Sequence, residues 1–147
     1  MNIEEQIEAL QISSLALIRW VNSEYEELIG KVTAKNRIIN QRAVRSILKI
    51  LSMSNGISQN ELAREVHLKA STVCVALNQM EKEGLIKRVD SENDKRKLNV
   101  YITSKGYDLK KEIDTIVQNV EEKMLKNISP AEKHDLQSTL LKILQNC

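Results

Sequence analysis

The residues best suited to chemistry lie in one charged segment in the second half of the chain. Asp94 is followed at once by three cations, Lys95, Arg96 and Lys97. Adjacent cations pair with nucleic-acid phosphates, and an arginine at such a tip can enter the narrow minor groove of a duplex. Asp94 would then orient the guanidinium of Arg96 through a charge-assisted hydrogen bond. The alternative is a charged hairpin whose mixed signs keep it soluble, although this does not account for its length.

A second candidate is the polar face of a helix expected from about Ala70 to Glu83. Four apolar residues should turn toward a core: Val73, Ala76, Leu77 and Met80. The outward face carries hydroxyls, amides, a valine and one cation, namely Ser71, Thr72, Val75, Asn78, Gln79 and Lys82. Amides can bind base edges in the major groove, and hydroxyls near a helix start can bind phosphates. A plain solvated face is the alternative, and only the position of this helix among its neighbours favours nucleic acid.

The elements around these residues follow a recognisable order. A helix with Asn40 as its N-cap is expected first, then a short helix that Ser58 and Glu61 begin with a capping box. "HLKA" forms a turn, the polar helix stops at Gly84, and two strands, "KRV" and "LNVYIT", enclose the charged segment. Helix, short helix, turn, helix and two-stranded hairpin is the order of a winged helix-turn-helix.

A long helix is expected before this module. Apolar residues recur at helical spacing from residue 3 to residue 29, and Gly30 is the expected C-cap of that single helix. These apolar residues surround more of the helix than one core face needs. Because a helix apolar on several sides must pack against more than one neighbour, the pattern favours contact with a second chain.

Two more helices are expected after the module. Thr103 or Ser104 should cap a helix from about residue 105 to residue 127. Ser129 and Glu132 form a second capping box at the start of the last helix, where Pro130 occupies the first position. One face of that helix is apolar: Leu136, Leu140, Ile143 and Leu144.

Composition argues against several classes of protein. Of 147 residues, 41% are apolar and 29% charged, as in an ordinary globular chain. No apolar run approaches the roughly 20 residues of a membrane span, and the acidic start "MNIEEQIEAL" is unlike a signal peptide, so a cytoplasmic protein with no membrane contact is expected. The two cysteines and two histidines are scattered, so neither a metal site nor another cofactor is expected. The sequence has no catalytic Ser-His-Asp or Cys-His pairing and no phosphate-binding glycine loop. An enzyme is therefore not expected.

Positive charge is concentrated in one stretch of the chain. Residues 31 to 49 contain no acid and six cations in a protein of net charge +2: Lys31, Lys35, Arg37, Arg42, Arg45 and Lys49. Such a block in a nearly neutral chain indicates a local anionic partner. A solvated helix face explains the block equally well when it is considered alone.

From Ile57 to Gly106 the chain resembles the winged-helix core of the multiple-antibiotic-resistance regulator (MarR) family. The shared features come in the family's order and spacing: "ELA", "STV", "ME" with "GLI", Arg88, "DKR" in the wing, and Thr103 with Gly106. No single motif is specific, but the set is. The expected helices on either side fit the family layout over nearly the whole chain.

The resemblance implies a homodimeric, usually repressing transcription factor that binds double-stranded DNA at a pseudo-palindrome. The first and last helices would interlace between subunits. The helix from Ala70 would enter the major groove, and Arg96, held by Asp94, the minor groove. Many members of the family also bind a small aromatic acid as effector. Trp20 and Tyr25 are candidates to line such a pocket, and packing in the dimer core is the alternative for both.

The chain departs from the family pattern around the turn and the polar helix. Lys69 stands where many relatives have an acidic N-cap, so that cap is lost or moves to Ser71. His67 replaces the glycine of the turn and tolerates a left-handed backbone. Val75 and Gln79 stand where relatives often carry arginine, which predicts weaker phosphate binding from this helix.

The sequence therefore predicts a mainly α fold with a small two-stranded β-wing, in one MarR-like chain covering 1–147. Residues 31–106 form the winged helix-turn-helix DNA-binding region, and residues 1–30 and 107–147 form long dimerisation helices. The expected function is sequence-specific, DNA-binding transcriptional regulation. A winged-helix module that binds proteins and has no operator is the alternative, and salt dependence separates the two. Cys74 is interpreted as a half-buried thiol rather than a redox sensor.

Overall fold

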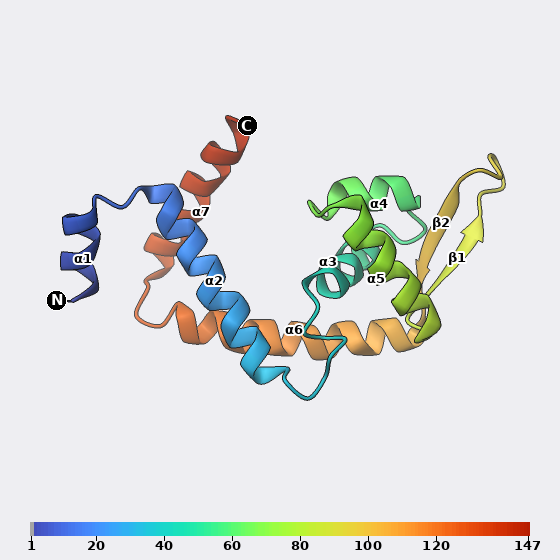
Figure 1. Ribbon diagram of the computed structural model, residues 1–147, viewed down its shortest axis with the longest axis horizontal. Coiled ribbons are helices and arrows are strands. Elements are labelled where there is room, and N and C mark those ends of the chain that lie inside the picture. Colours follow the sequence, from blue (N-terminus) through green and yellow to red (C-terminus); the bar gives the residue numbers. More distant parts are fainter. Residues whose placement is uncertain (1) are drawn as a thin grey trace.

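The computed structural model describes residues 2–147 and shows a mainly α chain with one small sheet (Figure 1). Met1, part of the predicted N-terminal helical region, lies outside the described residues. The elements are helices α1 (Ile3–Leu10), α2 (Ser14–Val32), α3 (Arg42–Met53), α4 (Gln59–Glu65), α5 (Ala70–Lys82), α6 (Ser104–Met124) and α7 (Pro130–Gln145), and strands β1 (Ile86–Asp90) and β2 (Leu98–Ile102). This confirms the predicted fold class. Within these residues, no helix combines the length and the apolar character that a membrane span needs.

The hydrophobic core lies between α3, α4, α5 and the sheet. Leu48 of α3, Leu62 of α4 and Leu77 of α5 are fully buried there. All four α5 residues expected to turn inward are buried. The turn between α4 and α5 contains His67 with a φ of 50°, the left-handed conformation that the sequence predicts. The order of elements is that of a winged helix-turn-helix.

Backbone hydrogen bonds join the sheet to the loop that leads into α4. β1 and β2 pair antiparallel, and a third segment lies along the other edge of β2. There the Gly56 N–H donates to the Val100 carbonyl, and the Val100 N–H donates to the Ile57 carbonyl, both at 2.9 Å. Gly56 has a φ of 83°, and a Cβ added to it would lie 2.8 Å from the Tyr101 ring. Glycine is therefore required where the loop meets the sheet.

The N-terminal helical region is broken, so the prediction of one helix from residue 3 to residue 29 is wrong. α1 ends because Gln11 adopts the left-handed conformation, with a φ of 48°. Ser13 then caps α2 by accepting a hydrogen bond from a first-turn N–H at 3.2 Å. α2 continues through Gly30 to Val32, so Gly30 lies inside the helix and is not its C-cap.

Two other predicted boundaries differ from the structure. The N-cap of α3 is Gln41 rather than Asn40, because the Asn40 carbonyl is held in the preceding loop by the Arg45 guanidinium at 2.9 Å. α6 ends at Met124 rather than near residue 127, since Asn127 has a φ of 67° and turns the chain toward α7.

α6 joins the two ends of the molecule. Thr103 caps it, as one of the two predicted caps, by accepting from the Gly106 N–H at 3.1 Å. Gly106 approaches the residue before β1 so closely that a Cβ added to it would lie 2.2 Å from the Leu85 carbonyl oxygen. Ile113 is buried in the winged-helix core, and farther along α6 packs against α2. Figure 1 shows α6 running beneath the molecule from the wing to the end helices.

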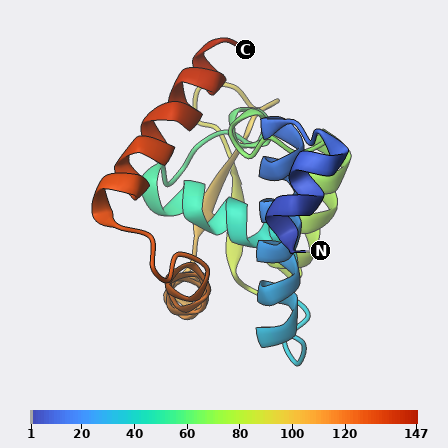
Figure 2. The same cartoon turned by 90° about the vertical axis from the view of Figure 1, so that its left-hand side faces the viewer.

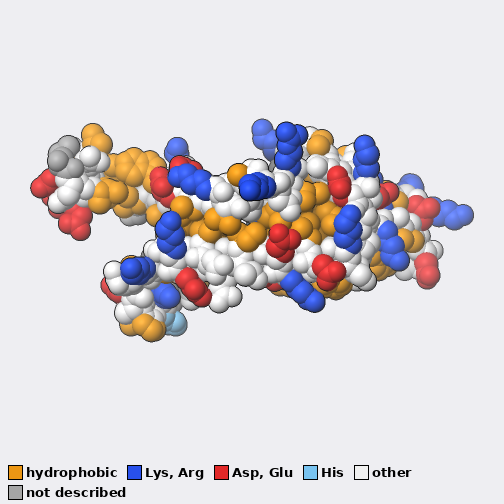
Figure 3. Space-filling model, turned by 90° about the horizontal axis from the view of Figure 1, so that it is seen from below, with side chains coloured by type: hydrophobic (Ala, Val, Ile, Leu, Met, Phe, Trp, Pro, Cys, Tyr) orange, Lys and Arg blue, Asp and Glu red, His pale blue; other side chains and the backbone are white. Residues whose placement is uncertain are grey.

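The two end helices, α1 and α7, contain no buried residue among those described. Both nevertheless begin with complete capping boxes, Asn2 with Glu5 and, as predicted, Ser129 with Glu132. Figure 2 shows α7 standing apart from α1 and α2, and Figure 3 shows hydrophobic side chains open at the α1–α2 end. We call the exposed hydrophobic residues of α1, of α2 up to Val21 and of α7 the end-helix surface: Ile3, Leu10, Leu15, Ile18, Trp20, Val21, Leu136, Leu141 and Leu144.

Candidate nucleic-acid interface

α5 presents a polar face to solvent. Its opposite side is packed into the core, so α5 cannot rotate without exposing apolar residues. The residues proposed from the sequence lie on the open side: Ser71, Thr72, Val75, Asn78 and Lys82 are exposed, and Gln79 is half-buried. Val75, 67% exposed, lies amid this polar surface. A helix face of this kind has the width of a DNA major groove, and amide side chains such as those of Asn78 and Gln79 are able to hydrogen-bond base edges.

The first turn of α5 has no side-chain cap. Lys69 is the N-cap residue and makes no capping hydrogen bond, and Ser71 lies within the helix. Of the two outcomes that the sequence left open, the structure shows the lost cap. The backbone N–H groups of this turn are therefore available to an anion such as a phosphate oxygen.

Arg88 of β1 ties α5 to its neighbours. Its Nε donates to the Glu81 carboxylate, its Nη1 to Gln59 Oε1 at 3.3 Å, and its Nη2 to Asn78 Oδ1 at 2.9 Å. The side chain of Arg88 is 18% exposed. From the sequence, Arg88 is recognisable only as a motif residue. The signal that could have revealed its role was Glu81. This acid lies beside a face expected to meet DNA, so its carboxylate requires a neutralising cation nearby.

Gln79 is held from the opposite side of α5. Gln41 Nε2 donates to Gln79 Oε1 at 2.9 Å and so links the start of α3 to α5. The contact accounts for the partial burial of Gln79. Together with Arg88, it fixes α5 relative to both α3 and the sheet.

The wing tip carries its cations on a closed backbone turn. The Ser91 N–H donates to the Lys97 carbonyl at 2.8 Å, and the Lys97 N–H donates to the Asp94 carbonyl at 2.9 Å. Asp94 Oδ1 accepts from the Arg96 N–H at 3.0 Å and lies 3.6 Å from Arg96 Nε. Because the Arg96 side chain is 94% exposed, it extends into solvent with Asp94 at its base. Lys95 and Lys97 are also exposed.

The basic block of residues 31–49 does not form a single patch. Arg45 is buried, where it donates to two loop carbonyls and pairs with Glu26 of α2. Lys31 pairs with Glu27 at 2.6 Å, and this hydrogen bond raises the pKa of the Lys31 amine. The block is therefore partly structural. Its other cations are exposed: Lys35, Arg37, Arg42 and Lys49.

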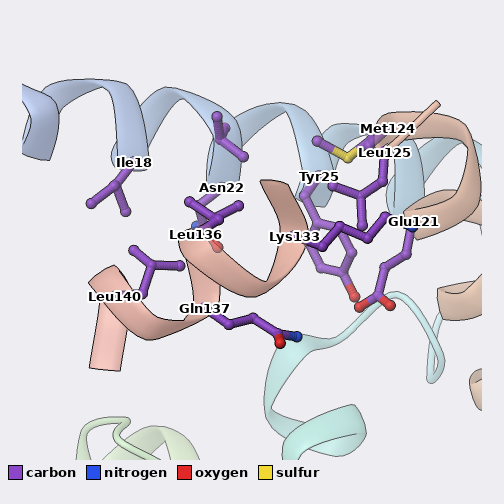
Figure 4. A pocket seen from close by; sticks show the side chains of 11 residues that line it. Ile18, Asn22, Tyr25, Glu121, Met124, Leu125, Lys133, Leu136, Gln137 and Leu140 are labelled. Carbon is purple, nitrogen blue, oxygen red and sulfur yellow. The ribbon is translucent and has the colours of Figure 1, made fainter. Parts of the chain in front are cut away.

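A cavity of about 400 Å³ lies among α2, α6 and α7 (Figure 4). Its wall is mainly apolar, with Ile18 of α2 opposite Leu136 and Leu140 of α7, and with Tyr25 and Glu121 at one end. Ile18 and Leu136 also belong to the end-helix surface. The cavity therefore suits an apolar occupant.

Tyr25 also lines a second cavity, of about 470 Å³, among α2, α3 and α6. Burial, followed by the nearby Glu121 carboxylate, raises the pKa of the Tyr25 hydroxyl, which therefore remains a hydrogen-bond donor. Tyr25 thus lies where the sequence suggested a pocket residue. Trp20, the other candidate, lines neither cavity and is 46% exposed.

Both cysteines are free and exposed. The expectation of a half-buried Cys74 is wrong, because its place on the flank of α5 faces solvent. The only hydrogen bond to its sulfur within residues 2–147 is a weak one from Asn78 Nδ2, at 4.0 Å. In the same residues, no three His, Cys, Asp or Glu side chains gather as metal ligands.

Residues 45–98 match the model of the MarR family. This segment runs from α3 to the first residue of β2 and so contains the helix-turn-helix and the wing tip. Among curated proteins, the HTH-type transcriptional regulator SarZ of Staphylococcus haemolyticus is 29% identical over 103 residues, which cover 69% of each chain.

Solved structures share the fold over a longer stretch. A MarR-family transcriptional regulator from Silicibacter pomeroyi superposes with a TM-score of 0.77 at 23% identity, covering 90% of this chain and 88% of the other. Bordetella bronchiseptica BpsR, whose DNA binding is regulated by 6-hydroxynicotinic acid, gives a TM-score of 0.80 at 17% identity, covering 89% and 92%. The shared fold therefore extends well beyond the winged module, over about nine-tenths of this chain.

Proposed function

We propose that this chain, a winged-helix protein of the MarR family, acts as a homodimer that binds a pseudo-palindromic DNA operator and regulates transcription. No chemical reaction is part of this role, because the protein binds and releases DNA without altering it. A regulator of this kind acts on DNA, so the proposed location is the cytoplasm.

The observation that carries the proposal is the placement of a polar helix face and a cationic hairpin tip on one winged-helix core. α5 and the wing both lie above α6 in Figure 1. α5 would enter the major groove with Asn78 and Gln79 toward the bases, while Arg96 reaches the minor groove beside it. Asp94 holds the backbone of Arg96, so the guanidinium starts from a fixed point.

Phosphate contacts would set the position of the protein on the duplex. Ser71 and Thr72 stand in the first turn of α5, where the uncapped N–H groups also point toward an incoming phosphate. Lys82 at the end of α5 and the two wing lysines add charge along the same path. Their contribution does not depend on base sequence, so it supplies affinity and salt dependence rather than specificity.

The end-helix surface supports the homodimer. A single chain exposes these side chains to water, and burying them against a second copy is favourable. Two-fold symmetry would then present one α5 to each half of a pseudo-palindrome, about 34 Å apart along the duplex.

Repression released by a small molecule completes the proposal. The cavity shared by α2, α3 and α6 lies where α2 meets the winged module, and Tyr25 offers a hydrogen bond there. An occupant that favours one relative arrangement of these helices would change the separation of the two α5 helices. The regulation of BpsR by 6-hydroxynicotinic acid is the precedent among structures of this fold.

A second candidate function is protein association through the winged helix without an operator. Its support is the largely uncharged open face of α5, with Val75 exposed within it. A hydrophobic protein interface responds little to salt. DNA binding through several phosphates weakens steeply as salt is added.

The test is binding of the full-length protein to duplex from the region upstream of its own gene. It is run at two salt concentrations, with unrelated duplex as competitor. We expect tight, salt-sensitive binding that survives the competitor. Binding without discrimination at both salt concentrations would count against an operator at this position. The absence of any enriched sequence in a selection from random duplex would then reject specific DNA binding altogether.

A further inference from the structure

The amide of Asn78 is oriented by a partner that can only donate. Arg88 Nη2 donates to Asn78 Oδ1 at 2.9 Å. Since a guanidinium has no acceptor, the amide atom facing Arg88 must be the oxygen. The amide nitrogen is then the opposite end, with Cys74 Sγ at 4.0 Å as a weak acceptor.

The guanidinium of Arg88 is itself held in place. Nε pairs with Glu81 of α5, and Nη1 donates to Gln59 of α4 at 3.3 Å. Its side chain is 18% exposed, whereas Asn78 lies on the open face of α5. Arg88 therefore cannot follow Asn78 into a groove, and the oxygen of Asn78 must stay turned toward β1 to keep the bond.

We infer that Arg88 makes Asn78 a hydrogen-bond donor toward DNA, so that Asn78 selects guanine over adenine; this inference rests on the proposed DNA-binding function. Adenine offers one donor and one acceptor in the major groove, and an asparagine binds both only by using its oxygen as well as its nitrogen. Guanine offers two acceptors, O6 and N7. The cationic Arg88 beside the amide oxygen also opposes the approach of a second donor, the adenine amino group.

Gln79 provides the contrast within the same helix. Its partner, Gln41, is also an amide, and the 2.9 Å contact between them persists if both amides reverse. Gln79 can therefore turn either its oxygen or its nitrogen outward. Of these two neighbouring amides, Asn78 alone has its polarity fixed by a donor-only partner.

The experiment selects operators from a pool of random duplex DNA with the full-length wild-type protein and with Asn78→Ala. Positions at which Asn78→Ala loses base preference are assigned to Asn78. We expect guanine there, preferred over adenine by about tenfold in the wild type. Adenine at these positions would overturn the inference, and so would an Asn78→Ala variant with an unchanged profile.

Base analogues then test the acceptors directly in the wild-type protein. Replacing the assigned guanine with 7-deazaguanine removes N7, and replacing it with 2-aminopurine removes O6. We expect a loss of affinity from each, and equal binding of all three bases would contradict donor-only recognition. These measurements need no variant to fold.

Arg88→Lys tests whether Arg88 orients the Asn78 amide, and it retains the positive charge. A lysine can pair with Glu81 but cannot hold Gln59 and Asn78 at the same time, so the preference for guanine over adenine should fall toward unity while overall affinity changes less. A preference retained in a folded Arg88→Lys dimer would overturn the role of Arg88. If wild-type selection enriches no sequence at any salt concentration, the proposed function fails first, and that outcome is distinct from an enriched operator with the wrong base.

Discussion

The winged module and the end helices solve the problem of burying apolar surface in opposite ways. In the module, α3, α4, α5 and the sheet enclose a core in which Leu48, Leu62 and Leu77 are fully buried. α1 and α7 have complete capping boxes but no buried residue within the described chain. Local signals are therefore sufficient to define a helix, whereas its packing partner must come from elsewhere. The module buries its own apolar residues, whereas the apolar residues of α1 and α7 remain at least partly exposed in a single chain.

The largest effect should come from the core of the module. Leu77→Ala should lower the free energy of unfolding by about 2–5 kcal/mol, because it leaves a cavity in a fully packed site. Val75→Ala on the open face of the same helix should change it by less than about 0.5 kcal/mol. Chemical denaturation of both variants provides the comparison. Equal effects would contradict the division of α5 into a packed and an open side.

The next effect should appear in dimerisation rather than in folding. Leu136→Lys places a charge on the end-helix surface and should weaken the dimer by about 2 kcal/mol or more, because an unpaired charge would be buried in the contact. Sedimentation over a dilution series measures the change. His134→Lys, on the opposite side of α7, is the matched control. A dimer that resists Leu136→Lys would show that α7 is not part of the interface.

A smaller effect is expected at the wing tip. Arg96→Ala should lower operator affinity by about 1–2 kcal/mol and leave thermal stability and dimerisation unchanged, since its side chain is 94% exposed. Lys111→Ala on α6 removes the same charge far from the wing and serves as the control. Binding titrations at several salt concentrations measure both variants. If both lose the same affinity, the wing contributes only general charge.

The smallest effect should come from a helix cap. Ser129→Ala removes the acceptor for the Glu132 N–H, a bond of 3.1 Å, and should cost about 1 kcal/mol locally. Hydrogen exchange should accelerate in the first turn of α7 and remain unchanged in α5. Faster exchange in α5 as well would mean that the end helices and the module do not behave as separate regions.

Features encoded by short-range patterns were predictable from the sequence. Ser58, Thr103 and Ser129 each cap the helix that the sequence assigns to them, because a cap involves residues only three positions apart. The inward residues of α5 followed from helical periodicity in the same way. These local signals were enough to place the helix-turn-helix and the wing.

Features that depend on distant or ambiguous residues were not predictable. The break at Gln11 has no strong signal, since glutamine rarely takes a left-handed backbone and the apolar spacing continues on both sides. In the sequence, Arg45 is one more cation of a basic block. In the structure it is buried, because its guanidinium donates to a carboxylate of α2 and to two loop carbonyls. Arg88 likewise gains its role only when α4, α5 and β1 meet.

α6 connects the winged module rigidly to α2. It is one uninterrupted helix, with Gly106 pressed against the residue before β1 and its far half packed against α2. A helix of 21 residues is ~30 Å long, so a tilt of about 5° at one end displaces the other by about 3 Å. In a symmetric pair both α6 helices would swing at once, and the distance between the two α5 helices would change by up to twice that amount. In the proposed complex with DNA, whose helical repeat sets the spacing of the two half-sites, a rotation this small at the end helices would take both α5 helices out of register with the duplex.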